Sequence, residues 1–146
     1  MKLIYMSSIY TIYIGYDHRE AIAYDVLKES ILDHSSIPIN IIPLKQEELR
    51  RVNFYRRNYY IKDKNNYDTT DNKPFSTDFS FTRFLIPFLN RLDGYALFMD
   101  CDMMVRSDIA EVFESVNRGE DKAVWCVKHR HIPNTSTKMD DKIQTV

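Results

Sequence analysis

An apolar run that leads directly into two acids constrains the fold of this chain more than any other stretch. Residues 96–99, Ala-Leu-Phe-Met, have the composition of a buried strand, and Asp100 and Asp102 interrupt the run before apolar residues resume at 103–105. Burying a carboxylate costs several kcal/mol unless a partner or a cation compensates. Residues two apart on an extended chain point to the same side. The pattern therefore predicts an acid pair that holds a cation, with Cys101 turned away from it into the core.

The segments near the N-terminus predict the fold class. Residues 9–14 are β-branched and aromatic, as in a buried strand. Asp17 then suits the N-cap of a helix expected over 18–33, and Glu20 would complete a capping box. A second strand is expected over 37–42. Strand, helix and strand in that order are typical of a βαβ unit with parallel strands.

The rest of the chain continues the alternation of helices and strands. Helices are expected over 44–49, 76–87 and 109–116, the last capped by Asp108, and a final strand over 122–127. This order predicts an α/β protein with a mostly parallel central sheet flanked by helices.

The helix expected over 76–87 would begin at Ser76, Thr77 and Asp78. Arg83 lies within its apolar face, which is expected to consist of Phe81, Phe84, Leu85, Phe88 and Leu89. Two interpretations of Arg83 stay open. Its stem packs while its head reaches water, or its guanidinium meets a buried acid or a phosphate.

Residues 50–72 interleave arginines and lysines with tyrosines. One interpretation is a solvated surface loop, and the other is a lid over an anionic ligand. His129 and His131 follow the last expected strand two residues apart. A metal-ligand role for them is an alternative to the ordinary exposed loop histidine.

Composition excludes several classes of function. The net charge is −1, so no global basic field favours nucleic acid. Cys101 and Cys126 lack the paired spacing of a zinc site or a disulfide scaffold, and a reducing, cytoplasmic location is expected. No run is long enough for a transmembrane helix, so any membrane association would be peripheral.

Two stretches resemble a known family. They are Phe75-Ser-Thr-Asp-Phe-Ser-Phe-Thr-Arg-Phe-Leu-Ile-Pro87 and Ala96-Leu-Phe-Met-Asp-Cys-Asp-Met103. A Thr-Arg-Phe helix shortly before a Met-Asp-x-Asp strand is similar to nucleotide-sugar-dependent glycosyltransferases with the Rossmann-like GT-A fold. The bacterial and large-virus enzymes akin to glycosyltransferase family 8 are the most similar. The likeness extends from Tyr16-Asp17 to the stretch 138–140.

The resemblance implies a function and a set of site residues. The enzyme would transfer a hexose from a UDP- or GDP-sugar to a glycan or lipid-linked acceptor. Asp100 and Asp102 would hold Mn²⁺ or Mg²⁺ on the donor diphosphate, and Asp100 would also contact the ribose or sugar. Arg83 would contact the donor sugar or its phosphates, and Tyr16 and Asp17 would line the base pocket. No residue is identified as a catalytic base.

The family's enzymes normally continue for about another hundred residues, which carry the acceptor site. Residues 1–146 are therefore expected to form the donor-binding part of one domain that is truncated at its C-terminus. Two alternatives remain. One is a phosphatase of the haloacid dehalogenase type, although Met104 stands where such enzymes have Thr or Ser. The other is a fragment that binds nucleotide sugar without catalysis.

Overall fold

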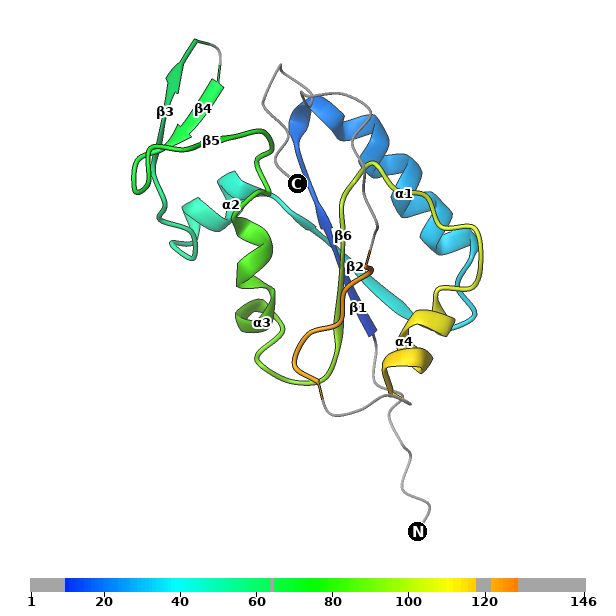
Figure 1. The fold of residues 1–146 in the computed structure, drawn as a ribbon. Coiled ribbons are helices and arrows are strands. Elements are labelled where there is room, and N and C mark those ends of the chain that lie inside the picture. Colours follow the sequence, from blue (N-terminus) through cyan, green and yellow to red (C-terminus); the bar gives the residue numbers. More distant parts are fainter. Residues whose placement is uncertain (1–9, 64, 118–121, 129–146) are drawn as a thin grey trace. The chain divides into compact units, whose positions relative to one another are not determined.

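A computed structural model describes residues 10–63, 65–117 and 122–128 (Figure 1). The chain divides into two compact units. The first comprises Met1–Arg56 and Thr77–Asn117, and the second comprises Arg57–Ser76 and Arg118–Val146. Among the helices in the described ranges, none is long and apolar enough to cross a membrane.

A parallel sheet of three strands forms the centre of the first unit. The strands are β1 (Tyr10–Gly15), β2 (Ile39–Leu44) and β6 (Ala96–Met99), in the order β2-β1-β6. Gly15 pairs with Leu44, and Ile14 pairs with Met99. The predicted α/β class and the parallel pairing are confirmed, although β2 begins two residues later than expected.

Four of the helical segments in the first unit follow the predicted order. They are η1 (His18–Glu20), α1 (Ala21–Asp33), α2 (Gln46–Arg51) and α4 (Ala110–Asn117), and Asp108 accepts a hydrogen bond from the Ala110 N–H as the expected cap.

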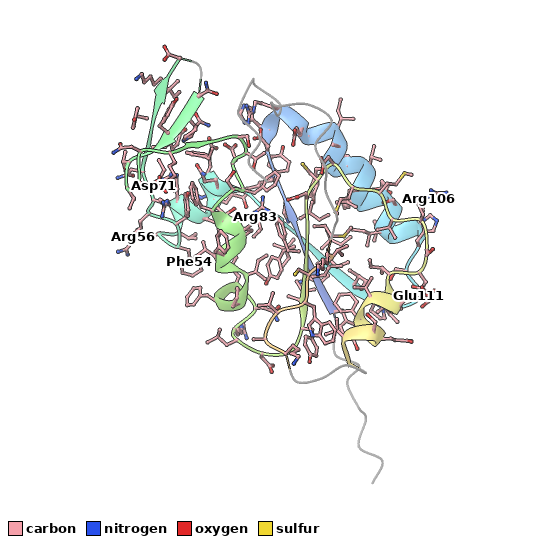
Figure 2. The ribbon with its side chains drawn as sticks, viewed as in Figure 1. Phe54, Arg56, Asp71, Arg83, Arg106 and Glu111 are labelled. Carbon is pink, nitrogen blue, oxygen red and sulfur yellow. The ribbon has the colours of Figure 1, made fainter. Side chains whose placement is uncertain are left out.

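Side chains fill both faces of the sheet (Figure 2). On one face Ile12 and Ile14 of β1 pack in a cluster with Leu27 and Ile31 of α1 and Phe113 of α4. On the other face Tyr13 packs with Leu44 and Ile86. Alternate residues of β1 thus point to opposite helical layers, as the period of a strand requires.

The helix expected from Ser76 is corrected. Residues 77–81 form turns, and helical structure begins only with η2 (Thr82–Leu85) and α3 (Ile86–Leu89). The Ser80 N–H donates to the Thr77 carbonyl three residues earlier, which is the bond of an isolated turn, and the Asp78 N–H donates to Asp17, which holds this stretch against the end of β1.

The expected apolar face of that helix is correct only in part, because Leu89 packs against the core. Phe84 and Phe88 are exposed, whereas Phe79 and Ile86 are buried. The late helix start changes which side of the segment faces the sheet. The outcome leaves two aromatic rings on the surface of the first unit.

Two expected strands are also corrected. β6 ends at Met99, and Cys101 and Asp102 lie in a turn, so the argument from extended chain does not apply to the acid pair. Residues 122–127 form no strand in the described part of the chain. Val124 and Val127 are exposed, and no described strand pairs with them.

The second unit contains an antiparallel sheet where a loop was one interpretation. Its strands are β3 (Tyr59–Lys62), β4 (Asn65–Asp68) and β5 (Pro74–Phe75). Buried Asp68 pairs with Arg57. Although burial raises the pKa of Asp68, the hydrogen bonds from Thr70 and Arg57 leave it below its usual value. The interpretation of this segment as a lid stays a prediction.

Gly15 lets a phenylalanine approach the end of β1. A Cβ added at Gly15 would lie 2.5 Å from a ring carbon of Phe79. Since real Cβ atoms do not approach so closely, the ring or the strand would have to move.

We therefore expect Gly15→Ala to lower the free energy of unfolding by about 1–3 kcal/mol because it overpacks this contact. Urea unfolding followed by circular dichroism measures the change. In the double variant with Phe79→Leu, the two losses should be clearly less than additive. Strict additivity would show that the two residues do not constrain each other.

Candidate functional site

Polar residues gather where the three parallel strands end. Tyr16 and Asp17 follow β1, Lys45 follows β2 and Asp100 follows β6. The register places these strand ends level with one another, and neighbouring strands lie about 4.8 Å apart. In open α/β sheets, ligands bind at this carboxyl edge.

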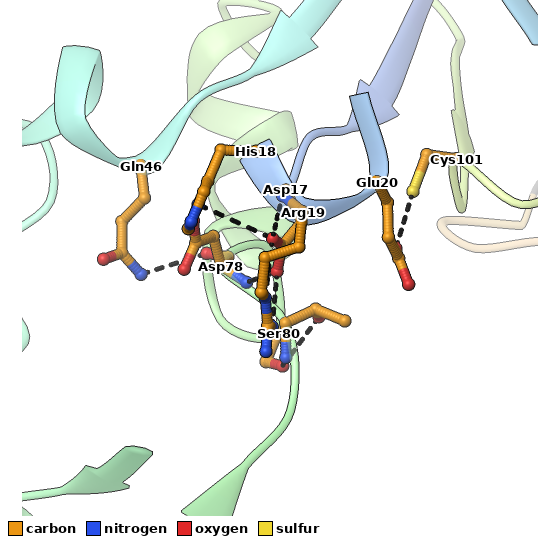
Figure 3. Close-up of polar contacts among 9 residues, drawn as sticks. Asp17, His18, Arg19, Glu20, Gln46, Asp78, Ser80 and Cys101 are labelled. Atoms are coloured by element: carbon orange, nitrogen blue, oxygen red, sulfur yellow. Dashed lines mark hydrogen bonds and ion pairs between the residues drawn. The ribbon is translucent and has the colours of Figure 1, made fainter. Parts of the chain in front are cut away.

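Asp17 is completely buried and fully bonded at this edge (Figure 3). The Arg19 side chain donates to both carboxylate oxygens, at 3.0 Å to Oδ1 and 2.7 Å to Oδ2. The backbone N–H of Arg19 donates to Oδ1 at 2.9 Å, which confirms Asp17 as an N-cap. The N–H of Asp78 donates to Oδ2 at 3.2 Å and ties residues 77–80 to the end of β1.

The bonds to Asp17 outweigh the cost of its burial. Burial alone would raise the pKa of Asp17, but the hydrogen bonds from Arg19 and Asp78, with the charge of Arg19, hold it below the ordinary value. Asp78 shows the opposite shift. Its burial and the nearby Asp17 charge raise the pKa of Asp78, while the interaction with His18 works against that rise.

His18 completes a small cluster with these two acids. Its Nδ1 lies 3.4 Å from Asp78 Oδ2 and 3.7 Å from Asp17 Oδ1. One ligand atom from each of the three residues lies within 4.8 Å of the others, which is close enough for a shared metal ion. Both oxygens of Asp17 are already bonded, however, so the cluster is better described as a hydrogen-bonded clamp.

Arg83 and Asp100, two of the residues predicted from the sequence, meet directly. Arg83 Nη2 lies 3.3 Å from Asp100 Oδ1. The guanidinium stacks over the rings of Phe79 and Phe98, at 5.3 and 4.9 Å from their centroids, and its Nε donates to the Phe79 carbonyl at 3.3 Å. Of the two interpretations of Arg83, the second holds in part, because the guanidinium meets an acid, but the Asp100 side chain is 44% exposed and is not the buried acid that was expected.

The Asp100 carboxylate is incompletely satisfied. Its Oδ1 is buried and accepts no hydrogen bond from the described residues. The atom interacts instead with the Arg83 guanidinium through the ionic contact. Asp102, in the turn that follows, is exposed. The two acids therefore lie in different surroundings, whereas the sequence predicts a pair on the same side of an extended strand.

Cys101 is a core residue, as predicted, although a turn and not strand alternation buries it. Its Sγ donates to Glu20 Oε2 at 3.1 Å. The Glu20 carboxylate therefore accepts from a thiol, whereas in the predicted capping box it would accept from the backbone N–H of Asp17. Burial, together with the hydrogen bond and negative charge of Glu20, raises the pKa of Cys101 to about 12. The contact ties η1 to the turn after β6.

Tyr16 lies half-buried between two neighbours. Its ring meets Tyr24 edge to face, with centroids 5.3 Å apart, and Lys45 Nζ lies 5.1 Å from the Tyr16 centroid. The face of a tyrosine ring attracts a cation. A cation and an aromatic ring are thus placed together at the sheet edge.

Sequence reasoning missed several members of this edge. The sequence indicates no role for His18 or Arg19, and it predicts Asp78 only in the first turn of a helix. An Asp followed by Arg two residues later was the available signal, but local spacing does not reveal the contact with Asp78, 61 residues away. His129 and His131 lie outside the described residues.

Comparison with known proteins gives one match. Protein CDI from Arabidopsis thaliana is 40% identical over 138 residues, which cover 94% of this chain and 48% of the relative. The chain thus spans about half the length of the curated relative that it matches. No family model matches the chain, and no solved structure matches it. The relative's name states no activity, so any function is argued from the geometry of the site.

Asp17→Asn should destabilise the fold by about 1–3 kcal/mol at pH 7, because it removes a charged acceptor of four hydrogen bonds. The folded pKa of Asp17 lies below its unfolded value of about 3.9. The stabilisation is therefore complete above that value and is lost as the pH falls through the folded pKa. Urea unfolding at pH 7 and at lower pH should show the difference between variant and wild type shrinking. A difference independent of pH would contradict this account.

The two cysteines should differ strongly in reactivity at pH 8. Cys101 is buried, with a pKa of about 12, whereas Cys126 is exposed. Because the thiolate is the reactive form, labelling with a maleimide should show one fast and one slow thiol. Cys126→Ser should abolish the fast phase and Cys101→Ala should preserve it. Loss of the fast phase in Cys101→Ala would refute the assignment.

Proposed function

We propose that this chain is the nucleotide-sugar-binding part of a glycosyltransferase with a GT-A fold. It would serve the transfer of a hexose from a UDP- or GDP-sugar to a glycan or lipid-linked acceptor. The observation that carries the proposal is the contact between Arg83 and Asp100 at the carboxyl edge of the parallel sheet. It joins the two stretches on which the sequence resemblance rests.

The residues present suit a divalent cation. Asp100 has a buried oxygen without a hydrogen bond, and Asp102 offers an exposed carboxylate one residue beyond Cys101. Carboxylate oxygens are the ligands that Mg²⁺ and Mn²⁺ prefer. When bound, such an ion would neutralise the charge of the nucleoside diphosphate leaving group.

The chain's own residues have separate tasks in this proposal. Arg83 is held by two rings and the Phe79 carbonyl, so its guanidinium is already oriented and can bind a donor phosphate at little entropic cost. The Tyr16 ring offers a face for a nucleobase. Since both oxygens of Asp17 are occupied, we assign Asp17 to positioning Arg19 and residues 77–80.

Calorimetric titration of UDP and of GDP, with and without Mn²⁺, tests this function. One of the two nucleotides should bind more tightly with Mn²⁺. Asp100→Asn and Asp102→Asn should each weaken the Mn²⁺-dependent binding about tenfold, because each removes a charged ligand. Asp25→Asn, which changes an exposed acid on α1, is the matched control and should bind as the wild type does.

Equal binding by the wild type and both site variants would refute the metal role. Measuring hydrolysis of the corresponding nucleotide sugar in the same samples separates catalysis from binding. Binding without hydrolysis or transfer would favour the alternative that the chain only binds the donor.

A further inference from the structure

An apolar groove on the first unit shares no residue with the site at the sheet edge. Its volume is about 510 Å³, and its lining consists of Phe54, Phe88, Leu89, Arg91 and Leu92. The rings of Phe54 and Phe88 meet edge to face, with centroids 5.3 Å apart. Nevertheless Phe54, Phe88 and Leu92 remain 50%, 59% and 81% exposed. We call these five residues the Phe54–Leu92 surface.

The backbone that presents Leu92 is strained. Arg91 and Leu92 have φ of 57° and 55°, in the left-handed region. A turn with positive φ at both central residues normally takes Asn and Gly, and each non-glycine residue in this region costs of order 1 kcal/mol.

Hydrogen bonds close this turn firmly. The Asp93 N–H donates to the Asn90 carbonyl at 3.1 Å, and the Asn90 amide donates to the Asp93 carbonyl at 2.6 Å. The Leu92 side chain gains little packing in return, because it is largely exposed. Strain without compensating burial is expected where a residue serves recognition.

Arginines outnumber acids around the groove, where Asp93, next to Leu92, is also exposed. Arg91 lines it and no acid does. Arg51 and Arg56 are exposed on either side of Phe54 in the sequence, and Figure 2 shows Phe54 and Arg56 on the same side of α3. Of the acids of α2, Glu48 pairs with Lys45 at 3.5 Å, and Glu47 shares its first turn, at the opposite end from Arg51.

We propose that the Phe54–Leu92 surface docks the chain onto an anionic phospholipid bilayer. Leu92 and Phe88 enter the headgroup region, where leucine and aromatic side chains are favourable. Arg56 and Arg91 meet the anionic headgroups. This inference is independent of the proposed glycosyltransferase activity, because it uses no residue of the nucleotide-sugar site.

Co-sedimentation of the 146-residue chain with vesicles of phosphatidylcholine and phosphatidylserine tests the proposal. The chain should bind these vesicles, and should bind pure phosphatidylcholine vesicles far less. Raising the salt from about 0.1 M to about 1 M, which shortens the screening length from about 10 Å to about 3 Å, should weaken the binding.

Leu92→Gly is the decisive variant, because it removes the anchor and also relieves the strain. It should lower the partition coefficient about tenfold, the loss expected for one buried leucine. It should also raise the thermal midpoint by about 2–5 °C. A misfolded variant cannot give this combination. Ile22→Ala, at a residue that is likewise 81% exposed but lies on α1, is the matched control and should bind as the wild type does.

Three outcomes would overturn the proposal. The first is an absence of binding to anionic vesicles. The second is binding that neither Leu92→Gly nor Phe88→Ser weakens. The third is a dimer in lipid-free sedimentation velocity that Leu92→Gly dissociates, since the surface would then serve contact between two copies of the chain.

Discussion

The close approach of Phe79 to Gly15 is the contact on which the candidate site depends. No other residue type at position 15 would leave room for the ring. The same ring supports the Arg83 guanidinium from one side, and the Phe79 carbonyl accepts from Arg83 Nε. Arg83 then reaches Asp100 at the end of β6. The absence of a Cβ at Gly15 thereby sets the position of the Arg83 guanidinium beside the end of β6.

Asp17 supplies a second tie between the same two segments. Its carboxylate accepts from the Asp78 N–H, one residue before Phe79. The polar tie and the apolar contact act on adjacent residues, so they fix both the position and the direction of the chain that leads into η2. Hydrogen bonds to charged groups contribute about 1.5–3 kcal/mol each. The site is therefore held by contacts far apart in the sequence and not by a local motif.

This dependence explains which predictions succeeded. The parallel sheet, α1 and α4 could be predicted because apolar periodicity and caps such as Asp17 and Asp108 are local signals. The start of the helix expected from Ser76 was wrong because contacts with a residue 61 positions away fix this segment, and local spacing does not reveal them. The antiparallel strands around Tyr60 were missed because their faces are largely polar or exposed, which removes the alternation that marks a half-buried strand. The sequence predicts that Arg83 contacts either a buried acid or a phosphate, but it does not identify Asp100 as the acid.

Hydrogen-bond satisfaction distinguishes the two acids that follow β1 and β6. Asp17 is completely buried, yet each of its oxygens accepts at least two hydrogen bonds, so a ligand would have to displace existing partners. The Asp100 side chain is 44% exposed, and its Oδ1, although shielded from water, has an ionic contact with Arg83 instead of a hydrogen bond. A contact of 3.3 Å without hydrogen-bond geometry satisfies such an atom only in part. A cation bound at Asp100 would complete the interactions of Oδ1, either beside Arg83 or in its place if a ligand binds the guanidinium. At Asp17 a cation would add no interaction that the carboxylate lacks. The asymmetry therefore favours Asp100 as the binding group and Asp17 as the support that keeps the edge in shape.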